Sequence, residues 1–175
     1  LLAIELIRKL DIFDKPAIIS LRYLKSIYDV ESLIRAIPLV LKDFPGAVFL
    51  IAGEGDEKEK LKQIAKDLGV LKNTKFLGWV PEEEIPRYLR TADIYVSTSL
   101  SDAGIASSTA EAMACGLPVI VTDFGANSQW VKDGEGGFIV FLKSPESLAG
   151  KIILLLKDKN KRMNFGEFNR KIIEE

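Results

Sequence analysis

The sequence has 175 residues, which is the size of one compact domain. Apolar side chains make up 47% of it, enough to bury a core at this length. The 24 basic and 25 acidic residues leave a net charge of −1, so composition gives no reason to expect nucleic acid as a partner.

Histidine is absent and there is one cysteine, Cys115. The chain therefore lacks the residues for Ser-His-Asp or Cys-His catalysis, for a histidine-ligated metal and for an internal disulfide. A lone thiol suits a cytoplasmic protein. No apolar run reaches the ~20 residues of a membrane-spanning helix, although a longer protein with this domain can still associate peripherally with a membrane. The chain opens at Leu1 rather than at methionine, so we expect residues before it.

Short apolar runs alternate with amphipathic stretches along the chain. Apolar residues at Val30, Leu33, Ile34, Ile37 and Leu41 have the spacing of an amphipathic helix. We predict strands at residues 17–20, 47–53, 74–77, 92–99, 118–123 and 137–141. We predict helices at residues 29–44, 57–68, 82–91, 106–115 and 145–157, and a further helical segment at the end of the chain.

Strands rich in Val and Ile, alternating with helices, predict a parallel sheet that is covered on both sides. The expected fold is a three-layer, Rossmann-like α/β domain with about six strands. Residues 1–175 should form this single domain, with a core from about 17 to 156. The outer stretches, 1–16 and 159–175, are expected to contact another domain. Ligands of such sheets bind beyond the carboxyl ends of the strands, so the loops there are the first candidates for a site.

Two cations follow the first predicted strand. Arg22 stands where the chain leaves the strand, and Lys25 is close behind it. Arginine can grip a diphosphate through two parallel hydrogen bonds, and lysine can bind it as a point charge. From spacing alone, these residues either bind a phosphate group or are solvated loop residues.

Glycines and an aromatic residue follow the next two strands. Gly53 and Gly55 permit close backbone approach to a ligand, but a plain tight turn is favoured because the full dinucleotide fingerprint is missing. Trp79 is expected to pack against the next helix rather than to stack on a base. The backbone of Val80 stays a candidate ligand contact.

The loop after the fourth strand leads into a helix of small residues. Its start, near Ile105 or Ala106, offers unpaired N–H groups and the positive end of the helix dipole, and both favour a phosphate. Asp102 and Gly104 lie in the loop before it. Glu111, an acid in an otherwise small and apolar helix, either accepts hydrogen bonds from two vicinal ribose hydroxyls or is a surface residue.

The stretch EAMACGLPVIVTD, from Glu111 to Asp123, strongly resembles the C-terminal domain of retaining glycosyltransferases with the GT-B fold. The resemblance is to the large glycogen-synthase-like and mannosyltransferase-like group called family 4. Supporting motifs lie in the same order as in that family: SLR, IAGEG, FLGWVPEEEI, ADIYVSTS and DGEGGFIV. The resemblance runs from about Ala17 to Leu156, and residues 92–140 are its most specific part.

This resemblance implies a donor site for a nucleotide diphosphate-sugar. Arg22 matches the arginine that contacts the donor diphosphate, and Glu111 matches the second acid of the E-x7-E motif, which binds the ribose hydroxyls. Residues 104–106 match the backbone that approaches the donor's phosphates and sugar. Val80 matches the position whose backbone meets the base.

Two positions depart from the family's pattern. The usual lysine-glycine pair falls here at Ile27 and Tyr28, so Lys25 or Tyr28 is expected to supply the second phosphate contact. The first acid of E-x7-E falls at Ala103, and Asp102, one residue away, is expected to contact the donor sugar in its place.

The activity that the resemblance implies is transfer of a sugar from a nucleotide diphosphate-sugar to an acceptor hydroxyl, with retention at the anomeric carbon. Arg22 and Lys25 would stabilise the leaving diphosphate, and neither a metal nor another cofactor is expected. The family's N-terminal acceptor domain, which carries a histidine near the reacting centre, is absent from this chain. We therefore expect the chain to bind UDP- or GDP-sugars weakly and to be inactive alone.

Two alternatives stay open. An epimerase or a sugar phosphorylase can share the fold, and the products of the full-length protein would separate either from a transferase. A non-catalytic nucleotide-sugar-binding or scaffolding module is the other, and a chain that binds none of UDP, GDP and ADP would favour the scaffold.

Overall fold

The computed structural model of the chain describes residues 2–174. Within them, a single sheet is built from β1 (Ala17–Leu21), β2 (Val48–Ala52), β3 (Thr74–Gly78), β4 (Ile94–Ser97), β5 (Val119–Thr122) and β6 (Gly137–Val140). All neighbouring strands pair in parallel, in the order β3-β2-β1-β4-β5-β6. The predicted parallel sheet of about six strands is confirmed.

Helices lie between the strands, before β1 and after β6. They are α1 (Leu2–Lys9), α2 (Val30–Asp43), α3 (Lys58–Asp67), α4 (Ile85–Leu89), α5 (Ser107–Ala114), α6 (Asn127–Trp130), α7 (Pro145–Lys157) and α8 (Lys159–Glu174). Short 3-10 helices are η1 (Ser26–Tyr28), η2 (Leu71–Asn73) and η3 (Glu82–Glu84).

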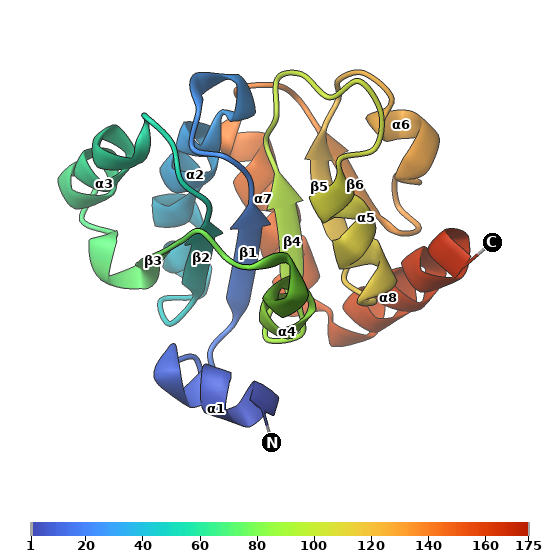
Figure 1. Ribbon diagram of the computed structural model, residues 1–175, viewed down its shortest axis with the longest axis horizontal. Helices are drawn as coiled ribbons and strands as arrows, with labels where there is room; N and C mark the ends of the chain where they lie inside the picture. The colour runs from blue at the N-terminus through green and yellow to red at the C-terminus, as the bar shows by residue number, and fades with distance from the viewer. Residues whose placement is uncertain (1, 175) are drawn as a thin grey trace.

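The sheet lies between two layers of helices (Figure 1), with α2, α3 and α7 against one face and α4 and α5 against the other. Neighbouring residues of a strand enter different cores: Ile18 belongs to the first and Ile19 to the second. This alternation follows from the pleat of a strand. Burial on both faces explains why the strands read as continuous apolar runs.

The two outer stretches complete this domain's own core. Leu6 of α1 and Leu10, which directly follows this helix, are buried against the face that also holds α4 and α5. In α8, Phe165 is buried and meets the ring of Phe138 edge-on, with centroids 5.5 Å apart. The core is therefore larger than residues 17–156. We expected these stretches to contact another domain, but their buried side chains pack into the core of this domain instead.

The strand order reverses between β1 and β4. From β1 the chain continues to β2 and β3 on one side, and then crosses to β4, β5 and β6 on the other. The loops after β1 and β4 therefore leave the sheet in opposite directions and open a crevice at its carboxyl edge. In Figure 1 these loops lie at the top of the view, above their two strands.

Candidate functional site

A cleft of about 600 Å³ lies at this reversal of strand order. Its walls come from the loops after β1, β2, β3 and β4 and from the start of α5. Among its lining residues are five that the sequence predicted as donor contacts: Arg22, Val80, Asp102, Ala106 and Glu111. The cleft is also lined by residues that the sequence did not predict there: Tyr23, Glu54, Trp79, Glu82, Ile85, Ser107 and Ser108.

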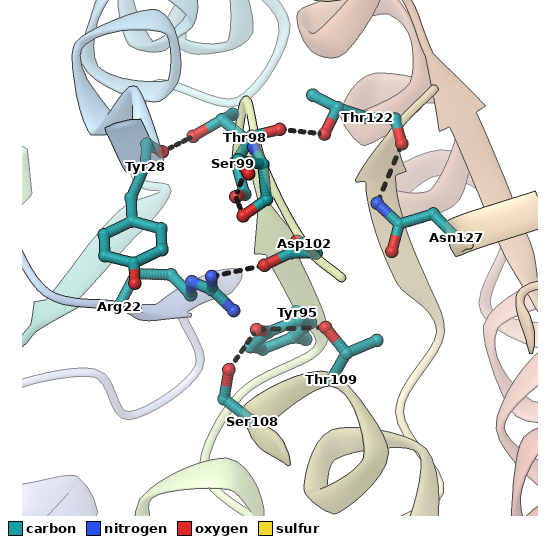
Figure 2. A network of polar contacts seen from close by, with 11 residues as sticks. Arg22, Tyr28, Tyr95, Thr98, Ser99, Asp102, Ser108, Thr109, Thr122 and Asn127 are labelled. Atoms are coloured by element: carbon teal, nitrogen blue, oxygen red, sulfur yellow. Dashed lines mark hydrogen bonds and ion pairs between the residues drawn. The ribbon is translucent and has the colours of Figure 1, made fainter. Parts of the chain in front are cut away.

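Arg22 is fixed inside the cleft by two neighbours (Figure 2). Its Nη2 donates to Oδ1 of Asp102 at 2.6 Å, and the two side chains are only 10% and 8% exposed. The guanidinium carbon of Arg22 also lies over the ring of Tyr28, 4.4 Å from the centroid of that ring. A guanidinium has five N–H donors. The bond to Asp102 orients Arg22 and leaves donors for an anion.

Lys25 does not line this cleft. Leu24 is buried beneath the loop, the chain turns into η1, and Lys25 instead lines a separate hollow of about 170 Å³ together with Glu57 and Lys60. The structure thus does not bring Lys25 to Arg22, and the predicted pair of cations around one diphosphate is not formed. Tyr28, the other residue considered for this contact, does line the cleft.

The glycine turn after β2 is explained by backbone packing. Gly53 has a φ of 128°, and a Cβ at this position would collide with the carbonyl oxygen of Arg22. A Cβ on Gly55 would collide with the carbonyl oxygen of Leu24. Glycine is needed here so that the β1 and β2 loops can touch. Close packing against the loop after β1, rather than a tight turn, therefore accounts for both glycines, and the contact fixes the backbone that carries Arg22.

The loop after β3 forms a rim of the cleft. Trp79 is 69% exposed there, so the prediction that it packs against the next helix is wrong. Gly78, with a φ of 72°, turns the chain out of β3 before this residue. Val80 has a buried side chain and lines the cleft, as does the exposed Glu82 at the start of η3.

The start of α5 faces the cleft. Ala106 is the N-cap, and its methyl side chain accepts no hydrogen bond from the first turn. Ala106, Ser107 and Ser108 line the cleft, whereas Gly104 and Ile105 do not, and Ile105 packs against the core. Of residues 104–106, which were predicted to approach the donor's phosphates and sugar, only Ala106 lines the cleft, together with the first turn of the helix. Uncapped N–H groups at a helix start favour an anion.

A buried tyrosine anchors this helix start to the sheet. The hydroxyl of Tyr95, on β4, lies 2.7 Å from Oγ of Ser108 and accepts a hydrogen bond from Oγ1 of Thr109 at 3.3 Å (Figure 2). Burial raises the pKa of Tyr95. The tyrosine therefore stays neutral and serves as a hydrogen-bonding strut beneath the cleft.

Glu111 faces the cleft from within α5. No hydrogen bond or ion pair joins its carboxylate to another residue between positions 2 and 174. Burial raises the pKa of this carboxyl, and the nearby carboxylate of Glu82 raises it further. A partly buried acid without a partner is an open acceptor for hydroxyl groups of a ligand.

Hydrogen bonds hold the loops of the carboxyl edge together. Oγ1 of Thr98 donates to the carbonyl of Asp29 at 2.8 Å and to that of Tyr28 at 3.1 Å. Oγ1 of Thr122 donates to the carbonyl of Ser99 (Figure 2). The loops after β1 and β4 are thus tied to each other and to the end of β5, which keeps the cleft preformed.

Within the described residues, no three or more Asp, Glu or Cys side chains gather where they could hold a metal ion. In the same part of the chain, no helix combines the length and the apolar character needed to cross a bilayer.

Residues 4–172 match the family described as glycosyl transferases group 1. The chain belongs to this family. Among curated relatives, an uncharacterized glycosyltransferase of Methanocaldococcus jannaschii is 31% identical over 147 residues, which cover 83% of this chain and 37% of the relative. A GDP-mannose-dependent alpha-(1-6)-phosphatidylinositol monomannoside mannosyltransferase of Mycolicibacterium smegmatis is 29% identical over 163 residues, which cover 90% of this chain and 43% of that protein.

Solved structures of glycosyltransferases have the same fold. Anabaena HepE, in a complex with UDP and glucose, superimposes with a TM-score of 0.92 at 22% identity, covering 99% of this chain and 47% of that chain. Staphylococcus aureus TarM, in a complex that includes UDP, gives a TM-score of 0.86 at 24% identity, covering 91% and 32%. The resemblance to the C-terminal domain of GT-B glycosyltransferases is confirmed. This group 1 glycosyltransferase chain spans less than half of the length of the relatives named here.

Proposed function

We propose that this chain is the donor-binding half of a retaining glycosyltransferase that uses a nucleoside diphosphate-sugar. The observation that carries the proposal is the meeting of Arg22 and Glu111 in one cleft at the reversal of strand order. The oriented cation of Arg22 suits the diphosphate of a nucleoside diphosphate, and the unpartnered carboxylate of Glu111 suits its ribose hydroxyls.

The diphosphate would lie between Arg22 and the start of α5. The guanidinium keeps donors that its bond to Asp102 does not use, and the helix start adds N–H groups and its dipole. These groups would stabilise the negative charge that develops on the diphosphate as it leaves the sugar, without a metal ion. In this assignment Asp102 positions Arg22, and a contact between Asp102 and the donor sugar stays a prediction.

The ribose would lie against Glu111. An ionised carboxylate accepts hydrogen bonds from two vicinal hydroxyls, and this one has no competing partner in the described chain. The base would then reach the rim formed by Trp79 and Val80. The names of the relatives do not choose a base, because the mycobacterial mannosyltransferase is GDP-mannose-dependent and Anabaena HepE was crystallised with UDP.

Transfer would require the part of the relatives that this chain does not span. The acceptor site is assigned to that part, and the chain alone is expected to bind donor without transferring its sugar.

Titration calorimetry with GDP, UDP and ADP tests the donor site. Glu111→Ala should weaken binding of the preferred nucleotide by about 1–3 kcal/mol, because two hydrogen bonds to hydroxyls are lost. Arg22→Lys, which keeps a cation beside Asp102 but loses the planar fork, should weaken it as well. Glu59→Ala, on the exposed surface of α3, is the control and should bind normally.

Unchanged affinity in Glu111→Ala would reduce this acid to a surface residue of the helix. If none of the three nucleotides binds the folded wild-type chain, the scaffold alternative is favoured and the donor site is contradicted.

A further inference from the structure

The rim after β3 presents three free hydrogen-bonding groups within three consecutive residues. Neither the backbone N–H nor the C=O of Val80 takes part in a hydrogen bond within residues 2–174. Two residues on, Glu82 is exposed in the same cleft, and its carboxylate forms no ion pair with a described cation. The rim therefore offers a donor and an acceptor from Val80, followed by the anionic acceptor of Glu82.

The hydrogen-bonding edges of guanine and uracil begin alike and end differently. Guanine presents O6, N1–H and its N2 amino group, which are an acceptor, a donor and a second donor. Uracil presents O4, N3–H and O2, which are an acceptor, a donor and a second acceptor. The N–H and C=O of Val80 suit the first two groups of either base. The third group would then meet the carboxylate of Glu82, to which the N2 amino group of guanine donates, whereas O2 of uracil would place lone pairs against it.

Adenine has the opposite order on its edge, with the N6 amino group as donor and N1 as acceptor, so it meets the N–H and C=O of Val80 when it is turned over. The carboxylate of Glu82 therefore serves to separate guanine from uracil, the base whose first two groups have the same order.

The place of Glu82 in the cleft agrees with this assignment. Glu82 and Glu111 line the same cleft, and the charge of Glu82 raises the pKa of Glu111. A nucleoside carries its base directly on its ribose, so a residue that reads the base belongs beside the residue that holds the ribose.

We infer that Glu82 makes this a guanine-selective site, so that the donor is a GDP-sugar. The inference rests on the proposed donor site and adds the identity of the base. The carboxylate is an exposed acceptor, which sets the expected selectivity at about tenfold rather than more.

Inosine diphosphate is the sharpest probe, because it lacks only the N2 amino group of GDP. Calorimetric titrations of GDP, inosine diphosphate and UDP into the wild-type chain should show GDP binding about tenfold more tightly than each of the others. Glu82→Ala should bring the ratio of GDP to inosine diphosphate affinity close to one. Glu83→Ala, an exposed neighbour that does not line the cleft, should keep the wild-type ratio.

Equal affinity of the wild-type chain for GDP and inosine diphosphate, tighter binding of UDP than of GDP, or an unchanged ratio in Glu82→Ala overturns the guanine assignment and leaves the donor site intact. If a chain with a folded circular dichroism spectrum binds none of these nucleotides, the donor site fails, and the guanine assignment with it.

Discussion

Arg22 has to be charged, ordered and available to a ligand at the same time. The carboxylate of Asp102, 2.6 Å away, and the ring of Tyr28 order the guanidinium. The pair is mostly buried, and for such pairs the cost of desolvation offsets much of the attraction. We therefore assign the contact to positioning of Arg22 rather than to stability of the fold.

Glu111 should make nucleotide binding sensitive to pH. Burial and the Glu82 carboxylate raise the pKa of Glu111, so this carboxyl is protonated at a higher pH than an ordinary glutamate. Protonation removes acceptor capacity, so affinity for GDP should fall as the pH drops through the raised pKa. Glu82→Gln removes the neighbouring charge and should move this fall to lower pH. Calorimetric titrations over a range of pH measure both shifts.

The control for this prediction is Glu111→Gln. The nucleotide's own phosphates still titrate in this variant, whereas the contribution of the carboxyl is gone. A pH profile identical to that of the wild type would show that Glu111 is not the group responsible. Folding stability depends on pH in the opposite direction to nucleotide affinity. Because the pKa of Glu111 is raised in the folded state, the ionised carboxylate destabilises the fold at neutral pH, so Glu111→Gln should raise Tm there.

The sequence could place Arg22 and Glu111 because a strand end and a family motif fix their positions. It could not place Lys25 or Trp79, whose directions depend on contacts within loops. Burial of Leu24 turns Lys25 away from the cleft, and the positive φ of Gly78 precedes the turn that exposes Trp79. Glu82 went unnoticed because the surrounding glutamates look like an ordinary solvated helix start.

At the scale of elements, one buried amide holds α8 to the sheet. Nδ2 of Asn169 donates to the carbonyls of Leu117 at 2.7 Å and Gly136 at 2.6 Å. Asn169→Ala leaves both buried carbonyls without this partner, so the free energy of unfolding should fall by about 2 kcal/mol, as denaturant titration can measure. Asn160→Ala, on the exposed part of the same helix, should change it by less than about 0.5 kcal/mol. Equal losses in the two variants would contradict this role of Asn169.

The strands and most helices could be predicted because two-sided burial and helical spacing are strong signals. The predicted helix at 82–91 is instead divided into η3 and α4. Pro86 has no N–H to donate to the carbonyl of Glu82, so a regular helix cannot run through this point. This break leaves Glu82 at the rim of the cleft. The helix α1 was not predicted, because residues 1–16 were interpreted only as contacts with another domain.

At the scale of the whole molecule, the cleft follows from the topology. Parallel strands bring all their loops to one edge, and the reversal between β1 and β4 opens that edge between Arg22 and the start of α5. The parallel α/β fold and the edge of the sheet that holds the cleft could be predicted from alternating strands and helices, whereas the strand order that sets the cleft between β1 and β4 was not predicted. The identity of the base could not be predicted in this way, because it depends on the backbone N–H and C=O of Val80 and on the carboxylate of Glu82.

A crystal structure of this chain with bound GDP tests the central claim most directly. We expect phosphate oxygens within hydrogen-bonding distance of the Arg22 guanidinium and the first turn of α5, and the ribose hydroxyls on the carboxylate of Glu111. A nucleotide bound elsewhere, or one in this cleft whose phosphates avoid Arg22 and whose ribose avoids Glu111, would contradict the account.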